Sequence, residues 1–364
     1  MNVQPVPHAQ PAGNPDNLVE VRDVKKWFPV QQGVLDKLLA AGHQDYIHAV
    51  DGVSFEIRRG EVFGLAGESG SGKSTTGRLV VRMETPTAGS IHFDGADISA
   101  LEGEELRRLR RRMQIIYQDP MASLNPRMAL GEAIGYGLKV HAPELGDAER
   151  HQRAIDMLEK VGLSPAQFFY GKFPHQISGG QRQRAVIARA LITHPDLILA
   201  DEPIAMADVS VRALLLDLMN QLKREFNLTY LFITHDLATA KYICDRIGIM
   251  YLGKLVEVAE LRELYSHPLH PYTQALLAST PGLVGADGQR RERIVLQGEL
   301  PSPLSPPPGC VFSTRCAYAT ERCRAERPLQ RPVDDRLVAC HYAEDFLAPA
   351  TRLASPGVLP TPVA

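Results

Sequence analysis

The sequence predicts an α/β fold in which helices cover a parallel β-sheet, and three features of the chain support this prediction. From about Asn17 to Glu263, short apolar strand segments alternate with helical segments. A glycine-rich turn with the pattern G-x-x-x-x-G-K-S separates one of these strands from the following helix. Hydrophobic residues make up 44% of the 364 residues, a globular share, and this length predicts more than one domain.

Two patterns identify the strands. Val53–Ile57 alternates apolar and polar residues, which is typical of a strand with one buried face. Glu61–Ala66 is almost entirely apolar, as expected for a parallel strand that is buried on both faces. The other predicted strands are Met113–Tyr117, Leu197–Ala200, Leu228–Thr234 and Arg246–Tyr251.

Helical periodicity predicts the structure of the intervening segments. A helix is expected at Thr75–Met83, directly after the glycine-rich turn. Asp147–Val161 has one apolar face and is followed by Gly162, a common helix stop. Val209–Phe226 has Asp208 in the N-cap position, where a carboxylate accepts hydrogen bonds from free backbone N–H groups.

Charge and hydropathy exclude several classes of protein. Lysine and arginine number 40 against 42 acidic residues, so the net charge of −2 gives no reason to expect a nucleic acid partner. No run approaches the roughly 18 apolar residues that a membrane-spanning helix needs. The polar, proline-containing residues 1–17 lack the pattern of a signal peptide, so we expect a disordered N-terminus and a cytosolic protein.

The composition changes in the C-terminal part of the chain. Leu300–Pro308 contains five prolines and is predicted to be a stiff connector. Four of the five cysteines follow it, between Cys310 and Cys340, whereas Cys244 lies elsewhere. In a reducing compartment, clustered thiols favour metal ligation over disulfides. Residues 347–364 are rich in proline and alanine and are predicted to be a disordered tail.

The glycine-rich turn has the features of a phosphate-binding loop. Its glycines let backbone N–H groups point at nucleotide phosphates, and the following helix adds the positive end of its dipole. Lys73 supplies a cation for the β- and γ-phosphates, and the Ser74 hydroxyl is suited to bind Mg²⁺. The segment comprises Gly67, Glu68, Ser69, Gly70, Ser71, Gly72, Lys73 and Ser74, followed by Thr75.

Two adjacent carboxylates follow the strand Leu197–Ala200. Ligands of parallel sheets bind at the carboxyl ends of the strands, so Asp201 and Glu202 are expected to face the phosphate loop. Asp201 could hold Mg²⁺ there, and Glu202 could orient and polarise an attacking water. The sequence therefore predicts a site that hydrolyses a nucleoside triphosphate.

Five further elements give the chain its resemblance to the ATP-binding cassette (ABC) family. Ile177-Ser178-Gly179-Gly180-Gln181 resembles the signature motif L-S-G-G-Q, with isoleucine in place of leucine. Gln118 resembles the Q-loop glutamine, Asp208 the D-loop aspartate and His235 the switch histidine. Phe28, which follows Trp27, resembles the aromatic residue that stacks on adenine in this family.

The resemblance implies a P-loop ATPase fold of the ABC type with a helical subdomain at about residues 119–183. It also implies a dimer in which each ATP is clamped between the phosphate loop of one subunit and the signature segment of the other. The catalytic residues would be Glu202, His235 and Lys73. Phe28, residues 67–75, Gln118 and Asp201 would contact ATP, with Ser74, Gln118 and Asp201 around Mg²⁺. Ser178, Gly179, Gly180, Gln181 and Asp208 would contact the ATP of the partner.

The chain beyond residue 263 narrows the resemblance to one branch of the ABC family. His267-Pro268-Leu269-His270-Pro271-Tyr272-Thr273 closely resembles a segment of oligopeptide and dipeptide importer ATPases, and residues 309–316 resemble the G-C-x-F-x-x-R-C motif of their C-terminal extension. The resemblance covers about residues 18–345. It implies that the chain is the ATPase subunit of a peptide importer and lies at the cytoplasmic face of the membrane. The partners would be a second ATPase subunit (this chain or a paralogue), two transmembrane permeases and an extracytoplasmic substrate-binding protein.

One departure from the family pattern leaves the substrate open. Ala205-Met206-Ala207-Asp208 stands where most cassettes have S-A-L-D, and the Met-containing form resembles a branch that includes oligosaccharide as well as peptide importers. A cassette ATPase of DNA repair or translation would need a coiled-coil insertion, two fused cassettes or a basic stripe, and the sequence has none of these. A regulatory protein with an inactive nucleotide site is disfavoured by the intact Lys73, Glu202 and His235.

The cysteines have the spacing C-x5-C-x6-C-x16-C, which differs from the C-x2-C of a zinc knuckle. Four thiolates also suit an iron–sulfur cluster, and the resemblance implies a four-iron, four-sulfur (4Fe-4S) centre, because some members of this importer family carry one there. A zinc site, with His341 as an alternative ligand, and four free thiols in a small hydrophobic module remain the alternatives. The cysteines are Cys310, Cys316, Cys323 and Cys340.

The expected domain organisation follows from these observations. A disordered N-terminus (residues 1–17) precedes an ABC ATPase domain (18–263). A cysteine-containing extension (264–346) and a disordered tail (347–364) complete the chain.

Overall fold

A computed structural model describes residues 14–30, 45–280, 294, 296 and 298–347 of the protein. The disorder predicted for residues 1–13 and 348–364 lies outside these ranges. The predicted boundary of the disordered N-terminus at residue 17 lies too far along the chain, because Asn17 is buried and begins a strand. The Asn17 side-chain amide donates a hydrogen bond to the Glu56 carboxylate at 2.8 Å, which fixes it to the neighbouring strand.

A mixed sheet of eight strands forms the centre of the molecule, and the predicted parallel strands form its middle. Strands β6, β7, β8, β3 and β9 lie side by side in this order and run parallel, whereas β10, β12 and β11 continue the sheet antiparallel from β9. The strands are β3 (Val62–Ala66), β6 (Met113–Ile116), β7 (Leu197–Asp201), β8 (Thr229–Thr234), β9 (Arg246–Tyr251), β10 (Lys254–Glu260), β11 (Arg331–Val333) and β12 (Arg336–Val338).

The N-terminal strands correct one expectation. They do not join the parallel sheet but form a second, antiparallel sheet in the order β2-β1-β4-β5. An antiparallel sheet can leave one face to solvent, which agrees with the alternation in Val53–Ile57, a segment of the longer strand β2. The four strands are β1 (Asn17–Pro29), β2 (Tyr46–Arg58), β4 (Ala88–Phe93) and β5 (Ala96–Asp97).

Two hydrophobic cores lie on opposite faces of the central sheet, and β3 contributes to both. Val62 and Ala66 pack in one core, whereas Phe63 and Leu65 pack in the other, which explains the continuous apolar sequence of this strand. Helices α9 (Val209–Phe226) and α10 (Leu237–Ile243) cover the first core. Helix α2 (Lys73–Val80) and the antiparallel sheet cover the second.

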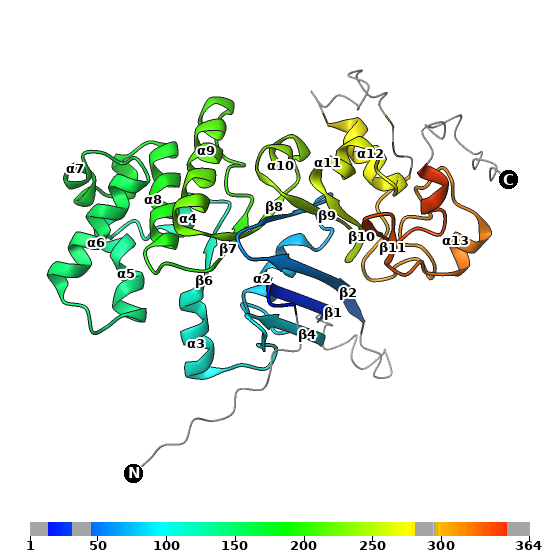
Figure 1. The fold of residues 1–364 in the computed structure, drawn as a ribbon, viewed down its shortest axis with the longest axis horizontal. Helices are drawn as coiled ribbons and strands as arrows, with labels where there is room; N and C mark the ends of the chain where they lie inside the picture. The colour runs from blue at the N-terminus through cyan, green and yellow to red at the C-terminus, as the bar shows by residue number, and fades with distance from the viewer. Residues whose placement is uncertain (1–13, 31–44, 281–293, 295, 297, 348–364) are drawn as a thin grey trace, which may run out of the picture.

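Most predicted helices are present with small shifts. The helix predicted at Thr75–Met83 is α2, which starts two residues earlier and ends before Arg82, whose φ of +54° is left-handed. A group of helices at one end of the sheet contains α5 (Leu130–His141), α6 (Asp147–Lys160), α7 (Ala166–Tyr170) and α8 (Gly179–Leu191) (Figure 1). The remaining elements of this half are α3 (Gly103–Arg112), α4 (Pro120–Ser123) and the 3₁₀ turn Pro174–Gln176.

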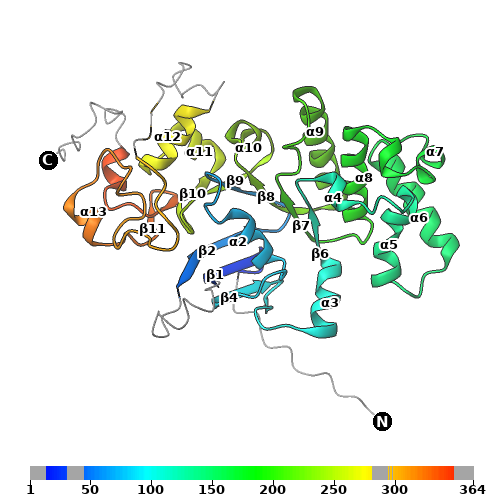
Figure 2. The ribbon, with the colours of Figure 1, turned by 180° about the vertical axis from the view of Figure 1, so that it is seen from behind.

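The C-terminal extension lies at the opposite end of the sheet from this helical group (Figure 2). It is not a separate unit, because its strand β12 pairs with β10 and so extends the central sheet. Its other elements are α11 (Leu261–Ser266), α12 (Pro271–Ser279), α13 (Glu321–Ala325) and the 3₁₀ turn Ala343–Phe346. Within the described ranges, no helix is long and apolar enough to cross a membrane.

Candidate ATP site

The phosphate loop lies between β3 and α2, and its glycines are required by the backbone. Gly67 and Gly72 have φ values of +153° and +103°. A Cβ at Gly67 would lie 2.1 Å from the Met250 carbonyl oxygen, and one at Gly72 would lie 2.3 Å from the Ala49 carbonyl oxygen. The loop therefore passes too close to two neighbouring strands for any larger residue at these positions.

Lys73 is held inside the loop. Its ammonium donates hydrogen bonds to the carbonyl oxygens of Gly67 and Glu68, each at 2.8 Å, and the residue is 6% exposed. Burial lowers the pKa of this ammonium, and the nearby carboxylates of Glu202 and Asp201 oppose that effect. The result is a desolvated cation in a fixed position, which is suited to an anionic ligand.

Ser74 connects the loop to the end of β7. Its hydroxyl donates a hydrogen bond to Asp201 Oδ1 at 3.0 Å. Burial raises the pKa of Asp201, and this hydrogen bond works against the rise. Two oxygen ligands of the type that Mg²⁺ prefers thus face each other across the site.

Glu202 is the point at which three segments of the chain meet. The backbone turns sharply there, with φ +49°, and the Glu202 N–H donates to the Ile233 carbonyl at 3.0 Å. The Gln118 amide donates to one carboxylate oxygen at 3.1 Å, and His235 Nδ1 lies 3.0 Å from the other. Because these residues follow β6, β7 and β8, the carboxyl ends of the parallel strands converge as predicted.

A large open cavity lies over the loop, and most of its lining was predicted from sequence. Ile47, Ala49 and Pro303 were not predicted to line it: the first two lie on β2, and Pro303 belongs to the proline-rich segment that was predicted only as a connector. Gly67, Glu68, Ser71 and Asp201 belong to the same loop and strand end but do not line it. The lining residues are Ile47, Ala49, Ser69, Gly70, Gly72, Lys73, Ser74, Thr75, Gln118, Glu202, His235 and Pro303.

The aromatic pair on β1 is not brought to this cavity. Phe28 is paired with Ile47 across the β1–β2 ladder, and the Lys26 ammonium lies 4.9 Å from its ring centre. Trp27 stacks on His48 with ring centres 4.5 Å apart. Phe28 therefore lies beside a lining residue without lining the cavity itself.

The signature residues also lie away from this cavity. Ser178 is the N-cap of α8, where its hydroxyl accepts from Gln181 N–H at 3.3 Å and its own N–H donates to the Gln181 side chain at 2.9 Å. Asp208 caps α9 in the same way by accepting from Val211 N–H at 2.9 Å. None of these residues is among the described residues that line the cavity. The set comprises Ser178, Gly179, Gly180, Gln181 and Asp208.

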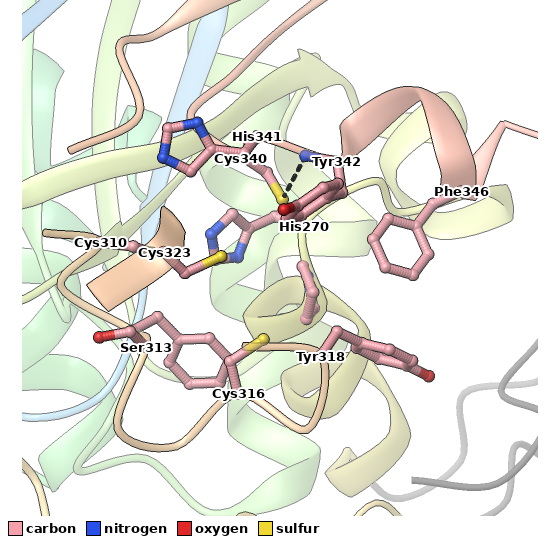
Figure 3. A pocket seen from close by; sticks show the side chains of 12 residues that line it. His270, Cys310, Ser313, Cys316, Tyr318, Cys323, Cys340, His341, Tyr342 and Phe346 are labelled. Carbon is pink, nitrogen blue, oxygen red and sulfur yellow. Dashed lines mark hydrogen bonds between the residues drawn. The ribbon is translucent and has the colours of Figure 1, made fainter. Parts of the chain in front are cut away.

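The four clustered cysteines line a single small pocket in the extension (Figure 3). Burial, with the proximity of the other thiols, raises the pKa of Cys316 and of Cys340 to about 12. These thiols are therefore protonated at neutral pH unless a metal displaces the protons. His341 lines the same pocket, but its Nε2 lies 3.0 Å from the Glu326 carbonyl oxygen. Among the described residues, no three His, Cys, Asp or Glu side chains are grouped so as to hold a metal ion.

Comparisons with known proteins agree with these features. The model of the ABC transporter family matches residues 50–205, and the model of the oligopeptide/dipeptide transporter C-terminal region matches residues 256–323. The chain is 48% identical to the oligopeptide transport ATP-binding protein AppF of Bacillus subtilis, over 91% of this chain and 98% of that protein. It is 43% identical to the dipeptide transport ATP-binding protein DppF of Haemophilus influenzae, over 90% and 97%.

A solved structure supports the fold. The dimeric post-hydrolysis structure of an ATP-binding cassette bound to ADP and Pi superposes with a TM-score of 0.58 at 29% identity. The match covers 67% of this chain and 99% of that one. The fold is therefore that of an ABC-type P-loop ATPase, and the chain belongs to the family of ATP-binding proteins of oligopeptide and dipeptide ABC transporters.

Proposed function

We propose that this protein is the ATP-hydrolysing subunit of an importer for dipeptides and oligopeptides. The observation that carries the proposal is the convergence of Gln118 and His235 on the Glu202 carboxylate, beside a cavity that Lys73 also lines. The names of the relatives, and the family match of the extension, support a peptide substrate over an oligosaccharide.

In the proposed reaction, the phosphate loop binds the β- and γ-phosphates of ATP. Lys73 contributes a cation whose position is already fixed by two carbonyl groups, so little conformational entropy is lost on binding. Ser74, Asp201 and Gln118 would hold Mg²⁺, which neutralises the charge on the phosphates during transfer. The 3.0 Å contact between Ser74 Oγ and Asp201 Oδ1 puts two of these ligands within reach of one ion.

Glu202 is proposed to orient and polarise the attacking water. The hydrogen bond from Gln118 to one carboxylate oxygen and the contact of His235 with the other restrict rotation of the carboxylate, and each oxygen keeps a second lone pair for a water proton. The water oxygen then bonds to the γ-phosphorus while one of its protons passes to the Glu202 carboxylate, the bond to the bridging oxygen breaks, and ADP and phosphate are the products. Phe28, next to Ile47 on the adjacent strand, is proposed to reach the adenine base.

The signature residues are proposed to act on the ATP of a second subunit. Ser178, with Gly179 and Gly180, forms the N-terminus of α8, and this end of a helix favours anionic groups. These residues do not line the cavity of their own chain, which supports an action between subunits. A similar cassette structure, described as dimeric, also supports it.

The assembly proposed for this protein is the one that its family implies. A second ATPase subunit would complete both ATP sites, and two transmembrane permeases would carry the peptide. An extracytoplasmic binding protein would deliver it, and the chain itself would be a peripheral protein of the cytoplasmic membrane face.

We also propose that the cysteine pocket holds a 4Fe-4S cluster. The pocket is lined by four thiols, the number of ligands that such a cluster takes. The spacing of the four cysteines in the sequence differs from the C-x2-C pairs of a zinc knuckle. The ligands would be Cys310, Cys316, Cys323 and Cys340.

Metal and sulfide analysis tests this part of the proposal. Anaerobically purified protein should contain iron and acid-labile sulfide, and Cys316→Ser should lose both. Cys244→Ser removes a buried thiol outside the pocket and should keep them. If the protein contains zinc but no iron, the pocket is a structural zinc site and not a cluster site. Four titratable thiols and no metal would contradict both the cluster and the zinc site.

Glu202→Gln tests the catalytic proposal. The amide keeps the shape of the side chain but cannot accept a water proton, so the reconstituted transporter should bind ATP and lose turnover by at least about a hundredfold. ATP hydrolysis and nucleotide affinity are measured in parallel. Glu149→Gln, an exposed carboxylate on α6, is the control and should hydrolyse ATP normally. Turnover at the wild-type rate in Glu202→Gln would overturn the assigned role.

A further inference from the structure

The described part of the C-terminal extension forms a hydrogen bond and an ion pair with Glu68 of the phosphate loop. The Tyr272 hydroxyl on α12 accepts a hydrogen bond from the Glu68 backbone N–H at 2.9 Å. The Arg315 guanidinium, next to Cys316, forms an ion pair with the Glu68 carboxylate at 2.9 Å. Tyr272 is fully buried, and the Arg315 side chain is 10% exposed, so water competes little for either contact.

The backbone carbonyl of Glu68 helps to position Lys73 in the phosphate loop. The Glu68 carbonyl accepts from the Lys73 ammonium at 2.8 Å and from the Ser71 N–H at 3.2 Å. Fixing the N–H and the carboxylate of Glu68 from outside the loop therefore fixes the orientation of the carbonyl that positions the cation.

An aromatic cluster with members from β9 and from the extension packs around both contact residues. The Tyr272 ring packs against Tyr251 and Phe312, with ring centres 4.7 and 5.3 Å away. The Arg315 guanidinium lies 5.9 Å from the centre of the Tyr251 ring. His270 caps the start of α12 by accepting from the Tyr272 N–H at 3.1 Å. The side chains that contact Glu68 thus both lie against this aromatic cluster.

A second contact joins the extension to the same cavity. Pro303 lines the cavity above the loop, and its carbonyl accepts from the His48 N–H at 3.1 Å. The proline-rich segment thus forms part of the wall next to Ile47 and Ala49.

We infer that the extension is part of the ATP site, and that Tyr272 and Arg315 are positioning residues that set the phosphate loop for ATP through Glu68. The inference rests on the proposed function, because it assumes that this loop binds ATP. A loop that is held before binding loses less conformational freedom when the nucleotide arrives. Releasing it should therefore weaken binding while leaving the Glu202 chemistry intact.

Two conservative variants of the full chain test the inference. Tyr272→Phe removes only the hydroxyl and keeps the aromatic packing, and Arg315→Ala removes the ion pair. Each should raise the Kd for a fluorescent ATP analogue by about three- to tenfold, because one charged or buried hydrogen bond is lost. In the assembled transporter, KM for ATP should rise similarly while kcat stays within about twofold. Arg315→Lys should recover part of the affinity.

Matched controls remove similar groups elsewhere. Arg331→Ala breaks an ion pair with Glu344 inside the extension, and Tyr265→Phe removes a hydroxyl bonded to the Leu237 carbonyl. Neither partner belongs to the loop, so both variants should bind ATP with wild-type affinity.

A double-mutant cycle separates positioning from general destabilisation. In a Glu68→Gln background the ion pair is already lost, so Arg315→Ala should cause little further loss of affinity. An equal loss in both backgrounds would overturn the inference, as would wild-type Kd values in Tyr272→Phe and Arg315→Ala. Failure of the wild-type chain to bind ATP would instead overturn the proposed function on which the inference rests.

Discussion

At the scale of single residues, the backbone conformation decides where the chemistry can occur. Glu202 occupies the left-handed region, which costs a non-glycine residue about 1–2 kcal/mol. The hydrogen bond from its N–H to Ile233 stabilises this turn, which directs the carboxylate toward Gln118 and His235. The adjacent carboxylates after β7 could be predicted from the sequence, and Pro203 marks a break in the strand pattern after them. The left-handed conformation of Glu202 could not be predicted, because a residue before proline usually adopts an extended conformation.

Lys73→Ala tests the importance of the loop cation. The change removes the charge that is proposed to face the phosphates and leaves two loop carbonyls without their donor. Charged hydrogen bonds contribute about 1.5–3 kcal/mol each, so ATP affinity should fall by about ten- to a hundredfold. Equilibrium binding of a fluorescent ATP analogue measures the change.

Lys223→Ala is the control for this experiment. Lys223 pairs with Asp245, and its side chain is also mostly shielded, but it does not line the nucleotide cavity. This variant should bind ATP normally. Equal affinity of the Lys73→Ala and wild-type proteins would show that the loop binds another ligand or none.

At the scale of elements, the sequence predicts what hydrophobic periodicity determines. The central parallel strands and helices such as α9 are long apolar or amphipathic runs, and the structure confirms them within one or two residues at most of their ends. β1 was not predicted, because irregularities in its pairing near Val21, Val24 and Lys26 interrupt the alternation. The addition of β12 to β10 depends on a contact about eighty residues apart, which local patterns do not record.

One buried carboxylate on β10 fixes the start of the extension. The Glu257 oxygens accept from the backbone N–H groups of Leu269 at 2.8 Å and His270 at 3.0 Å. Burial raises the pKa of Glu257, and these hydrogen bonds act against that rise. The segment that leads into α12, and hence to Tyr272, therefore depends on a side chain of the cassette.

Glu257→Gln should loosen this junction. A glutamine has one acceptor oxygen, so one backbone N–H would face an amide N–H₂, and an unsatisfied buried group costs about 1–3 kcal/mol. Hydrogen exchange of the Leu269 and His270 amides should accelerate, and the midpoint of chemical unfolding should fall. Glu326→Gln changes an exposed carboxylate elsewhere in the extension and should leave both quantities unchanged. Unaltered exchange in Glu257→Gln would show that the junction is held by apolar packing alone.

At the scale of the whole molecule, the two ends of the central sheet have different relations to the ATP site. The extension reaches the phosphate loop within the same chain, through Glu68 and the wall at Pro303. The helical group at the other end holds the signature segment, which does not reach the cavity of its own chain. The first relation could not be predicted from the sequence, because Arg315 and Glu68 are distant in the chain and no motif links them. The second is what the resemblance to ABC proteins implies.

Ser178→Asp tests the proposed action of the signature helix on a second subunit. Aspartate is as good an N-cap as serine, so α8 should keep its start, but the new negative charge would face the phosphates of the partner's ATP. The isolated chain should therefore bind ATP with wild-type affinity, because Ser178 does not line its cavity. The assembled transporter should lose at least about tenfold in ATP hydrolysis, since like charges oppose closure. Ser178→Asn keeps the cap and the size of aspartate without its charge, so it should retain most of the activity. If Asp and Asn variants hydrolyse ATP equally well, no phosphate lies against this helix. If Ser178→Asp instead loses ATP binding in the isolated chain, the signature segment contacts the ATP of its own subunit.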